Sequence, residues 1–272
     1  MLRLWGIHAR LDCMWLLKDF NNFAICVITD VIENIASVAG VWLIAEKFAG
    51  IGGIGKYQIL FLLGYSLTVS GIINTFFGSN VFYISRTIGR GQLDHVLMQP
   101  QPVWLTLLTE GFIPASGSAV LLTGVIMLSY AISMLSWAFN LTWLLLLVVS
   151  ILLSTVVNLC YSFLWGTLAF YSPVAAEEVC TSVVEFFSTL RDFPLGGIAR
   201  FWQLILLSVI PVGICAWYPT VYLNSANVYF GVTVVLIIAI IFILITFLAF
   251  RKGLDYYVRK GSYRYYDRGH RR

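Results

Sequence analysis

Two long stretches of this chain contain no charged residue: Gly111–Ala176 and Phe201–Phe250. Since an α-helix rises about 1.5 Å per residue, about 20 apolar residues cross the roughly 30 Å hydrocarbon core of a bilayer. The first stretch is long enough for two crossings, and the second for one crossing and a shorter segment. A soluble domain of this size could not bury so much apolar sequence. The chain is therefore predicted to be a polytopic integral membrane protein.

The composition favours helices over a membrane barrel. Hydrophobic residues make up 60% of the chain and charged residues only 11%. Inside lipid every backbone N–H and C=O must be paired, which leaves helices or a closed barrel. Barrel strands are short and alternate apolar with polar residues, whereas the apolar stretches here are long and continuous. We therefore expect an all-α fold and a single transmembrane domain over residues 1–272.

Polar breaks divide residues 22–250 into six expected spans. Five of them lie near residues 22–45, 57–81, 104–135, 141–170 and 228–250. Two segments compete for the remaining span: residues 174–190, which contain three glutamates, and residues 201–218, which Pro211 interrupts. One of these segments is expected to cross, and the other to be a re-entrant or interfacial piece.

The two ends of the chain indicate its orientation. Residues 251–272 contain eight Lys or Arg and two Asp, which gives this basic tail a net charge of +6. Basic segments beside a span stay in the cytoplasm, so six crossings place both termini there, in the inner (plasma) membrane. Residues 1–21 place Leu4, Ile7, Leu11 and Met14 at helical spacing, which predicts an amphipathic helix in the membrane interface. Lipid rather than nucleic acid is the expected contact of the basic tail.

Two motifs suggest chemistry within or between the spans. The glycine-rich run Gly50–Lys56 resembles a phosphate loop, but Tyr57 stands where such a loop needs Ser or Thr to hold magnesium. We interpret the run as a turn. Asp30 and Glu33 are three residues apart on one helix face, so both carboxylates can point into the bundle. Charges inside a membrane are costly and often functional. The pair is either a cation or proton site, or a solvated pair near the cytoplasmic half.

The residue types needed for enzymatic chemistry are scattered. The five cysteines show no paired spacing, and the three histidines lie outside the expected spans. The sequence therefore predicts no metal site and no catalytic residues. An intramembrane enzyme is the least favoured class of function.

The polar stretch Tyr83–Val103 carries the most specific pattern. Its segment Gly89-Arg90-Gly91-Gln92-Leu93-Asp94-His95-Val96-Leu97-Met98-Gln99-Pro100 resembles the signature after the second span of ABC-2-type permeases, the membrane subunits of ABC exporters. Three further segments match the family in order: 48–55 with 60–64, the proline-marked region 193–219, and the basic end 251–257. Together these matches cover nearly the whole chain.

The resemblance implies a function and a set of partners. The chain would be one permease of an ATP-driven exporter, paired with an identical or paralogous permease and with cytosolic ATPase subunits that bind ATP and Mg. It would itself bind no cofactor and would not be an enzyme. Residues 174–190 would be the fifth span, and residues 193–222 a hairpin in the outer leaflet. The coupling element within residues 83–103 would dock on the ATPase through Arg86, Arg90, Leu93, Asp94, Leu97 and Pro100.

A different class of function remains open. An ion-coupled secondary transporter would use Asp30 and Glu33 as its ion site. Such folds usually contain inverted repeats with broken helices, and no convincing internal repeat is visible in this chain.

Overall fold

The computed structural model describes residues 2–47, 53–78, 85, 87–88, 91–109, 111–135, 140–225 and 227–261. These residues fold into an all-helical protein. The helices are α1 (Leu2–Lys18), α2 (Phe20–Lys47), α3 (Lys56–Phe76), α5 (Leu93–Leu97), α6 (Val103–Thr109), α7 (Pro114–Met134), α8 (Leu141–Gly166), α9 (Pro173–Arg191), α10 (Arg200–Ser208), α11 (Val212–Cys215), α12 (Trp217–Tyr222) and α13 (Val228–Lys260). Two short 3₁₀ turns, Thr167–Phe170 and Leu195–Gly197, follow α8 and α9.

Five of these segments are long and apolar enough to cross a membrane. They are Phe20–Gly40, Lys56–Phe76, Gly117–Met134, Leu141–Phe170 and Val228–Lys260. Each lies at a place where the sequence predicts a span. The chain therefore has the architecture of a multi-pass membrane protein.

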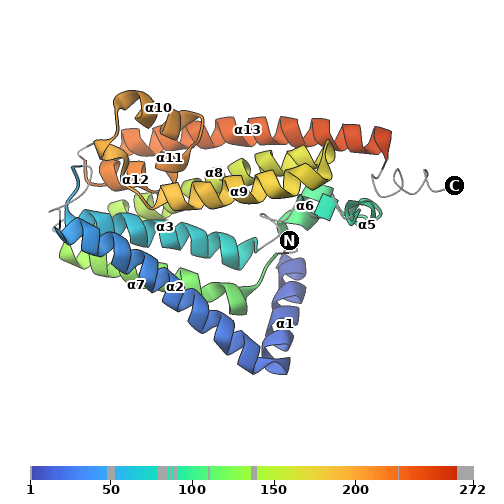
Figure 1. Ribbon diagram of the computed structural model, residues 1–272, viewed down its shortest axis with the longest axis horizontal. Helices are drawn as coiled ribbons and strands as arrows, with labels where there is room; N and C mark the ends of the chain where they lie inside the picture. Colours follow the sequence, from blue (N-terminus) through green and yellow to red (C-terminus); the bar gives the residue numbers. More distant parts are fainter. Residues whose placement is uncertain are drawn as a thin grey trace.

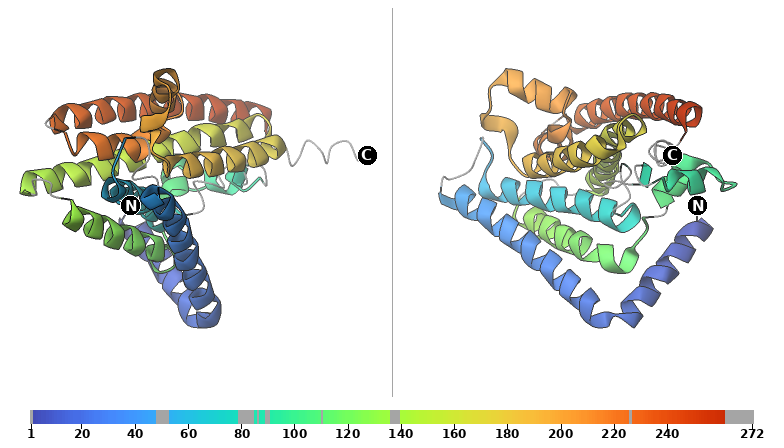
Figure 2. Two further views of the ribbon diagram at one scale, coloured as in Figure 1. Left: turned by 60° about the vertical axis from the view of Figure 1, so that its left-hand side comes forward. Right: turned by 45° about the vertical axis from the view of Figure 1, so that its right-hand side comes forward.

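The helices form a bundle with distinct ends. Helices α3, α7, α8, α9 and α13 run along the long axis, with α10–α12 gathered at one end and α5 and α6 at the other (Figure 1). Helices α1 and α2 meet at an angle beside Asp19, and the apex of this V lies away from the bundle in both views of Figure 2. Several hydrophobic side chains of α1 are at least half exposed, among them Ile7, Leu11 and Met14.

The closest helix pair is α3 with α7, which run antiparallel. A Cβ on Gly71 would lie 2.3 Å from Cα of Leu121, and one on Gly124 would lie 2.5 Å from the backbone N of Thr68. Such approaches are possible only because a glycine on one helix faces the backbone of the other, the usual means of close packing between membrane helices. The glycines of this pair recur seven residues apart on each helix, as Gly64 and Gly71 on α3 and Gly117 and Gly124 on α7.

Hydrogen bonds between buried polar groups attach the short helices α11 and α12 to α8. The hydroxyl of Tyr222 donates to Oγ of Ser150 at 2.7 Å, and Nε1 of Trp143 donates to the carbonyl of Leu223 at 3.0 Å. The Ser154 hydroxyl lies 2.8 Å from that of Tyr65 on α3 and donates to the carbonyl of Ile214 at 3.2 Å. A buried polar group costs free energy unless it is paired, so these bonds fix how α11 and α12 pack on the bundle.

Two expected spans differ from the structure. The segment 104–135 is not one helix, because α6 ends at Thr109 and α7 begins at Pro114, whose ring and missing N–H suit the first turn of a helix. The last helix is longer than expected and continues through the basic residues to Lys260, where Gly261 with φ of +78° ends it. The segment 201–218 is divided among α10, α11 and α12, whereas α9 is one unbroken helix.

Candidate functional site

The predicted coupling element contains a short helix, α5, that is held against the rest of the chain. Leu93 is completely buried and Val96 is 6% exposed. Both belong to a cluster of apolar side chains. The cluster also includes Leu107 of α6, Phe170 of the 3₁₀ turn after α8, and Tyr257 of α13. Burial of these side chains stabilises the position of α5 on the bundle.

The structure separates Leu93 from Leu97, two residues that the resemblance assigns to docking on the ATPase. Leu93 points into the protein, whereas Leu97 is 38% exposed and Met98 is 74% exposed. The apolar side chains exposed at the C-terminal end of α5 are therefore Leu97 and, directly after the helix, Met98. Pro100 is also exposed, and Arg86 and Arg90 lie outside the described residues.

A hydrogen bond joins α5 to the end of α13. The hydroxyl of Tyr257 donates to Oδ1 of Asp94 at 2.8 Å, so Asp94, which the resemblance assigns to docking, has a partner on α13 of its own chain. Tyr257 is buried, and its ring lies 6.2 Å from that of Phe170. A Cβ on Gly253 would lie 2.4 Å from the ring of Phe170. The extension of α13 beyond Phe250 thus packs closely behind the coupling element.

Asp30 and Glu33 line a cavity of about 540 Å³ between α2, α3, α7 and α9. Asp30 is partly buried and Glu33 is exposed, and both lie on the side of α2 that lines the cavity. The other polar side chains among the described lining residues are Asn34, Ser70, Asn74, Ser188, Thr189, Arg191 and Asp192. The structure therefore brings the predicted acidic pair together with charged residues that are far away in the sequence.

Arg191, at the end of α9, is only 5% exposed and is bound to α3. Its Nε donates to Oγ of Ser66 at 2.7 Å, and its Nη2 donates to Oγ of Ser70. Ser66 in turn donates to Oδ1 of Asp192 at 2.5 Å, and Nε of Arg191 lies 4.0 Å from the same oxygen. This network pairs the buried guanidinium, which would otherwise be very costly.

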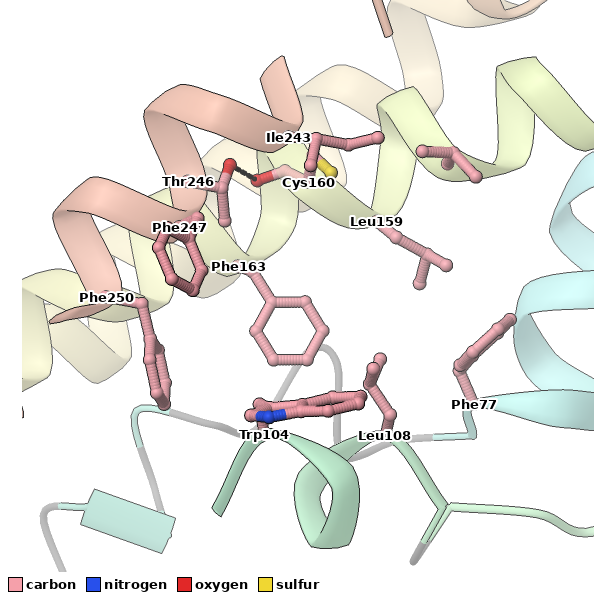
Figure 3. A pocket seen from close by; sticks show the side chains of 11 residues that line it. Phe77, Trp104, Leu108, Leu159, Cys160, Phe163, Ile243, Thr246, Phe247 and Phe250 are labelled. Carbon is pink, nitrogen blue, oxygen red and sulfur yellow. Dashed lines mark hydrogen bonds between the residues drawn. The ribbon is translucent and has the colours of Figure 1, made fainter. Parts of the chain in front are cut away.

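A second cavity, of about 610 Å³, is apolar and lies between α6, α8 and α13 (Figure 3). Trp104 and Leu108 of α6 form one side, and Phe247 and Phe250 of α13 form another. The Thr246 hydroxyl at its wall already donates to the carbonyl of Cys160 at 2.9 Å. This cavity can accept an apolar group such as a lipid chain.

Sequence reasoning missed Arg191 and Asp192. Both residues follow the segment in which a fifth span was sought, and their contacts with α3 join positions more than 120 residues apart. The only signal in the sequence is the adjacent pair of opposite charges directly after an apolar helix, a pattern that does not name its partners.

The comparisons with known proteins agree with this architecture. The family model described as ABC-2 family transporter protein matches residues 31–261, which include every candidate membrane span except the beginning of α2. No curated protein and no solved structure was found to match the chain. Because the family model covers most of the chain, the protein belongs to the ABC-2 family of membrane transport proteins.

Proposed function

We propose that this chain is the permease subunit of an ATP-driven exporter. It acts with a second permease, identical or paralogous, and with separate cytosolic subunits that bind ATP and Mg and hydrolyse the nucleotide. The observation that carries the proposal is the family match over residues 31–261. The five candidate spans and the short helix α5 at one end of the bundle support it.

The proposed topology has six crossings, with α9 as the fifth. The continuity of α9 supports this choice, since its 19 residues form one helix that begins at Pro173. The segment 201–218 is broken near Pro211 and Ala216 into helices of at most nine residues. Because about 20 helical residues are needed to cross, we assign α10–α12 to a re-entrant hairpin at the outer end.

The end of the bundle that holds α5 is assigned to the cytoplasm. The extension of α13 carries Arg251, Lys252, Arg259 and Lys260 at this end, and basic residues next to a span favour the cytoplasmic side. Helix α1 then lies in the inner interface with its uncovered apolar side chains in lipid.

Coupling to ATP hydrolysis is assigned to Leu97 and Met98. A small helix that docks in a groove depends on a few apolar anchors, and these two are the exposed apolar side chains at the C-terminal end of α5. Leu93, Val96 and the Tyr257–Asp94 hydrogen bond would then pass the movement of the docked helix to α13.

The test replaces both exposed anchors, as Leu97→Asp with Met98→Asp, in the tagged full-length chain. The complex is purified from membranes through the tag, and its ATP hydrolysis is measured. We expect the variant to retain less than about a tenth of the wild-type activity, since a buried charge at a docking anchor costs more than about 1.4 kcal/mol.

The control is Gln101→Asp, which introduces one carboxylate beyond Pro100 and leaves both exposed anchors in place. We expect it to keep the activity of the wild type, and the permease alone to hydrolyse no ATP. Full activity in the double variant would exclude α5 as the docking helix.

The position of Asp30 and Glu33 in a polar cavity favours one second candidate, an ion-coupled secondary transporter. Inactivating only the ATPase subunit separates the two. Export that stops supports the ATP-driven mechanism, whereas export that continues and follows an ion gradient supports the secondary transporter.

A further inference from the structure

We propose that the cavity between α2, α3, α7 and α9 binds the ammonium head group of an amphiphilic organic cation, with its apolar tail in the adjoining groove of α2 and α7. As a statement about the exported substrate, this inference rests on the proposed function. As a statement about binding, it rests only on the two adjoining cavities and on the groups that line them.

The electrostatics of the cavity call for a positive charge. Three carboxylates and one guanidinium are among its described lining residues. Arg191 and Asp192 form a network of their own with Ser66 and Ser70. Among the described lining residues, Arg191 is bound within this network, and it does not compensate the negative charges of Asp30 and Glu33. Intramembrane charges are costly when unpaired, so a bound cation is favoured here.

The dimensions of the cavity select an organic cation over a bare metal ion. Its volume of about 540 Å³ lies in the range of sites for small organic molecules. A hard metal ion requires six to eight oxygen ligands within about 2.6 Å, which suits a much tighter cage. An alkylammonium group, in contrast, supplies one diffuse positive charge opposite Asp30 and Glu33 in a cavity whose lining also includes the polar side chains of Asn74 and Ser188.

An apolar groove of about 680 Å³ lies next to the polar cavity. Val38 of α2 lines both, so the two spaces adjoin along this helix. The remaining described lining of the groove is almost wholly apolar and includes Ile35 and Trp42 of α2, Leu60 of α3 and Ile126 of α7. A polar end next to an apolar groove matches a molecule with a charged head and a hydrocarbon tail.

The test measures binding of tritium-labelled decyltrimethylammonium to the full-length chain in phosphatidylcholine nanodiscs, with empty nanodiscs subtracted. We expect Asp30→Asn with Glu33→Gln to weaken binding at least about tenfold, since it removes both charged partners of the head group. The matched control, Glu178→Gln with Glu185→Gln, removes two exposed carboxylates of α9 that do not line the cavity and is expected to bind as the wild type.

A second variant tests the tail without changing any charge. Ile126 is 67% exposed and lines the groove, so Ile126→Ser should leave the fold intact. We expect it to reduce the preference for decyltrimethylammonium over tetramethylammonium by a few fold, because less apolar surface covers the tail.

Three results would overturn the proposal. The first is equal affinity in the wild type and the Asp30/Glu33 variant. The second is displacement of the probe by decyl maltoside, which is uncharged, as effectively as by unlabelled probe. The third is displacement by potassium at the same concentration, which would indicate an inorganic ion site. The binding assay contains neither the ATPase nor ATP, so its result does not depend on the proposed function. If the chain binds the probe but the ATPase test shows no ATP-driven export, only the proposed function is contradicted.

Discussion

Helices α2 and α3 follow one another in the chain and have nearly the same hydropathy, yet they occupy opposite environments. In α3, 72% of the apolar window is buried inside the protein, whereas none of the described residues in the window of α2 is buried. Helix α3 presents glycines and hydroxyl groups to its neighbours. Helix α2 presents isoleucines at positions 25, 28, 32 and 35, which are all more than half exposed.

This difference shows that hydropathy identifies membrane helices but does not rank them from centre to edge. Lipid is as apolar as leucine, so large aliphatic side chains gain little by leaving it for a protein neighbour. Small residues permit close backbone contact, and polar residues find hydrogen-bond partners only inside the bundle. The central helix of this protein is therefore marked by its glycines and serines.

The largest effect on stability is expected when the buried guanidinium that binds α3 is removed. Arg191→Met leaves Asp192 without its charged partner and breaks the bonds to Ser66 and Ser70. We expect the free energy of unfolding to fall by about 3–5 kcal/mol, measured by denaturant unfolding in detergent micelles. Arg200→Met is the control, because Arg200 is exposed. Equal stability of both variants would show that α3 does not depend on this network.

A methyl group added to each helix gives a more direct contrast. In Gly71→Ala the new Cβ would overlap the backbone of Leu121, and we expect a loss of about 1–3 kcal/mol. In Gly40→Ala on α2 nothing lies within 4 Å, and a gain of up to about 1 kcal/mol is expected from the better helix propensity of alanine. Thermal unfolding of the two variants in the same detergent is the measurement. A comparable loss in both would contradict the peripheral position of α2.

The smallest effect is expected on the exposed face of α2. Ile32 is 61% exposed, so Ile32→Ala should change the stability of the single chain by less than about 0.5 kcal/mol. Crosslinking in membranes measures, in the same variant, whether two permeases still associate. Unchanged monomer stability with weaker association would assign this face to the second permease, and no change in either would assign it to lipid. A large loss of monomer stability would place α2 inside the bundle after all.

The sequence predicted the spans because uncharged length alone decides whether a segment can cross a membrane. The prediction was less accurate where a local break decides the boundary. Glu110 and Pro114 lie between α6 and α7 in a segment that is otherwise long and apolar enough for one span, and hydropathy alone does not show that the helix breaks there. The end of α13 was also misjudged, because Lys and Arg favour helices as well as tails, and Gly261 rather than the first charge ends the helix.

The sites depended on contacts that a sequence pattern does not carry. The resemblance named Leu93 and Leu97 together as docking residues, but it did not show that Leu93 faces its own chain. Asp30 and Glu33 were recognisable as unusual charges. Their cavity also requires Ser70 and Arg191, and only the packing of α2 and α9 against α3 brings these four residues together.

The length of α13 has a mechanical consequence. Its 33 residues make a rod about 50 Å long at about 1.5 Å per residue. Tyr257 touches α5 near one end of this rod, and Gly231 packs on the ring of Tyr222 of α12 near the other. A tilt of only about 5° would displace one end of such a rod by about 4 Å relative to the other. A displacement of α5 would thus be transmitted to α12 by the tilt of this one unbroken helix.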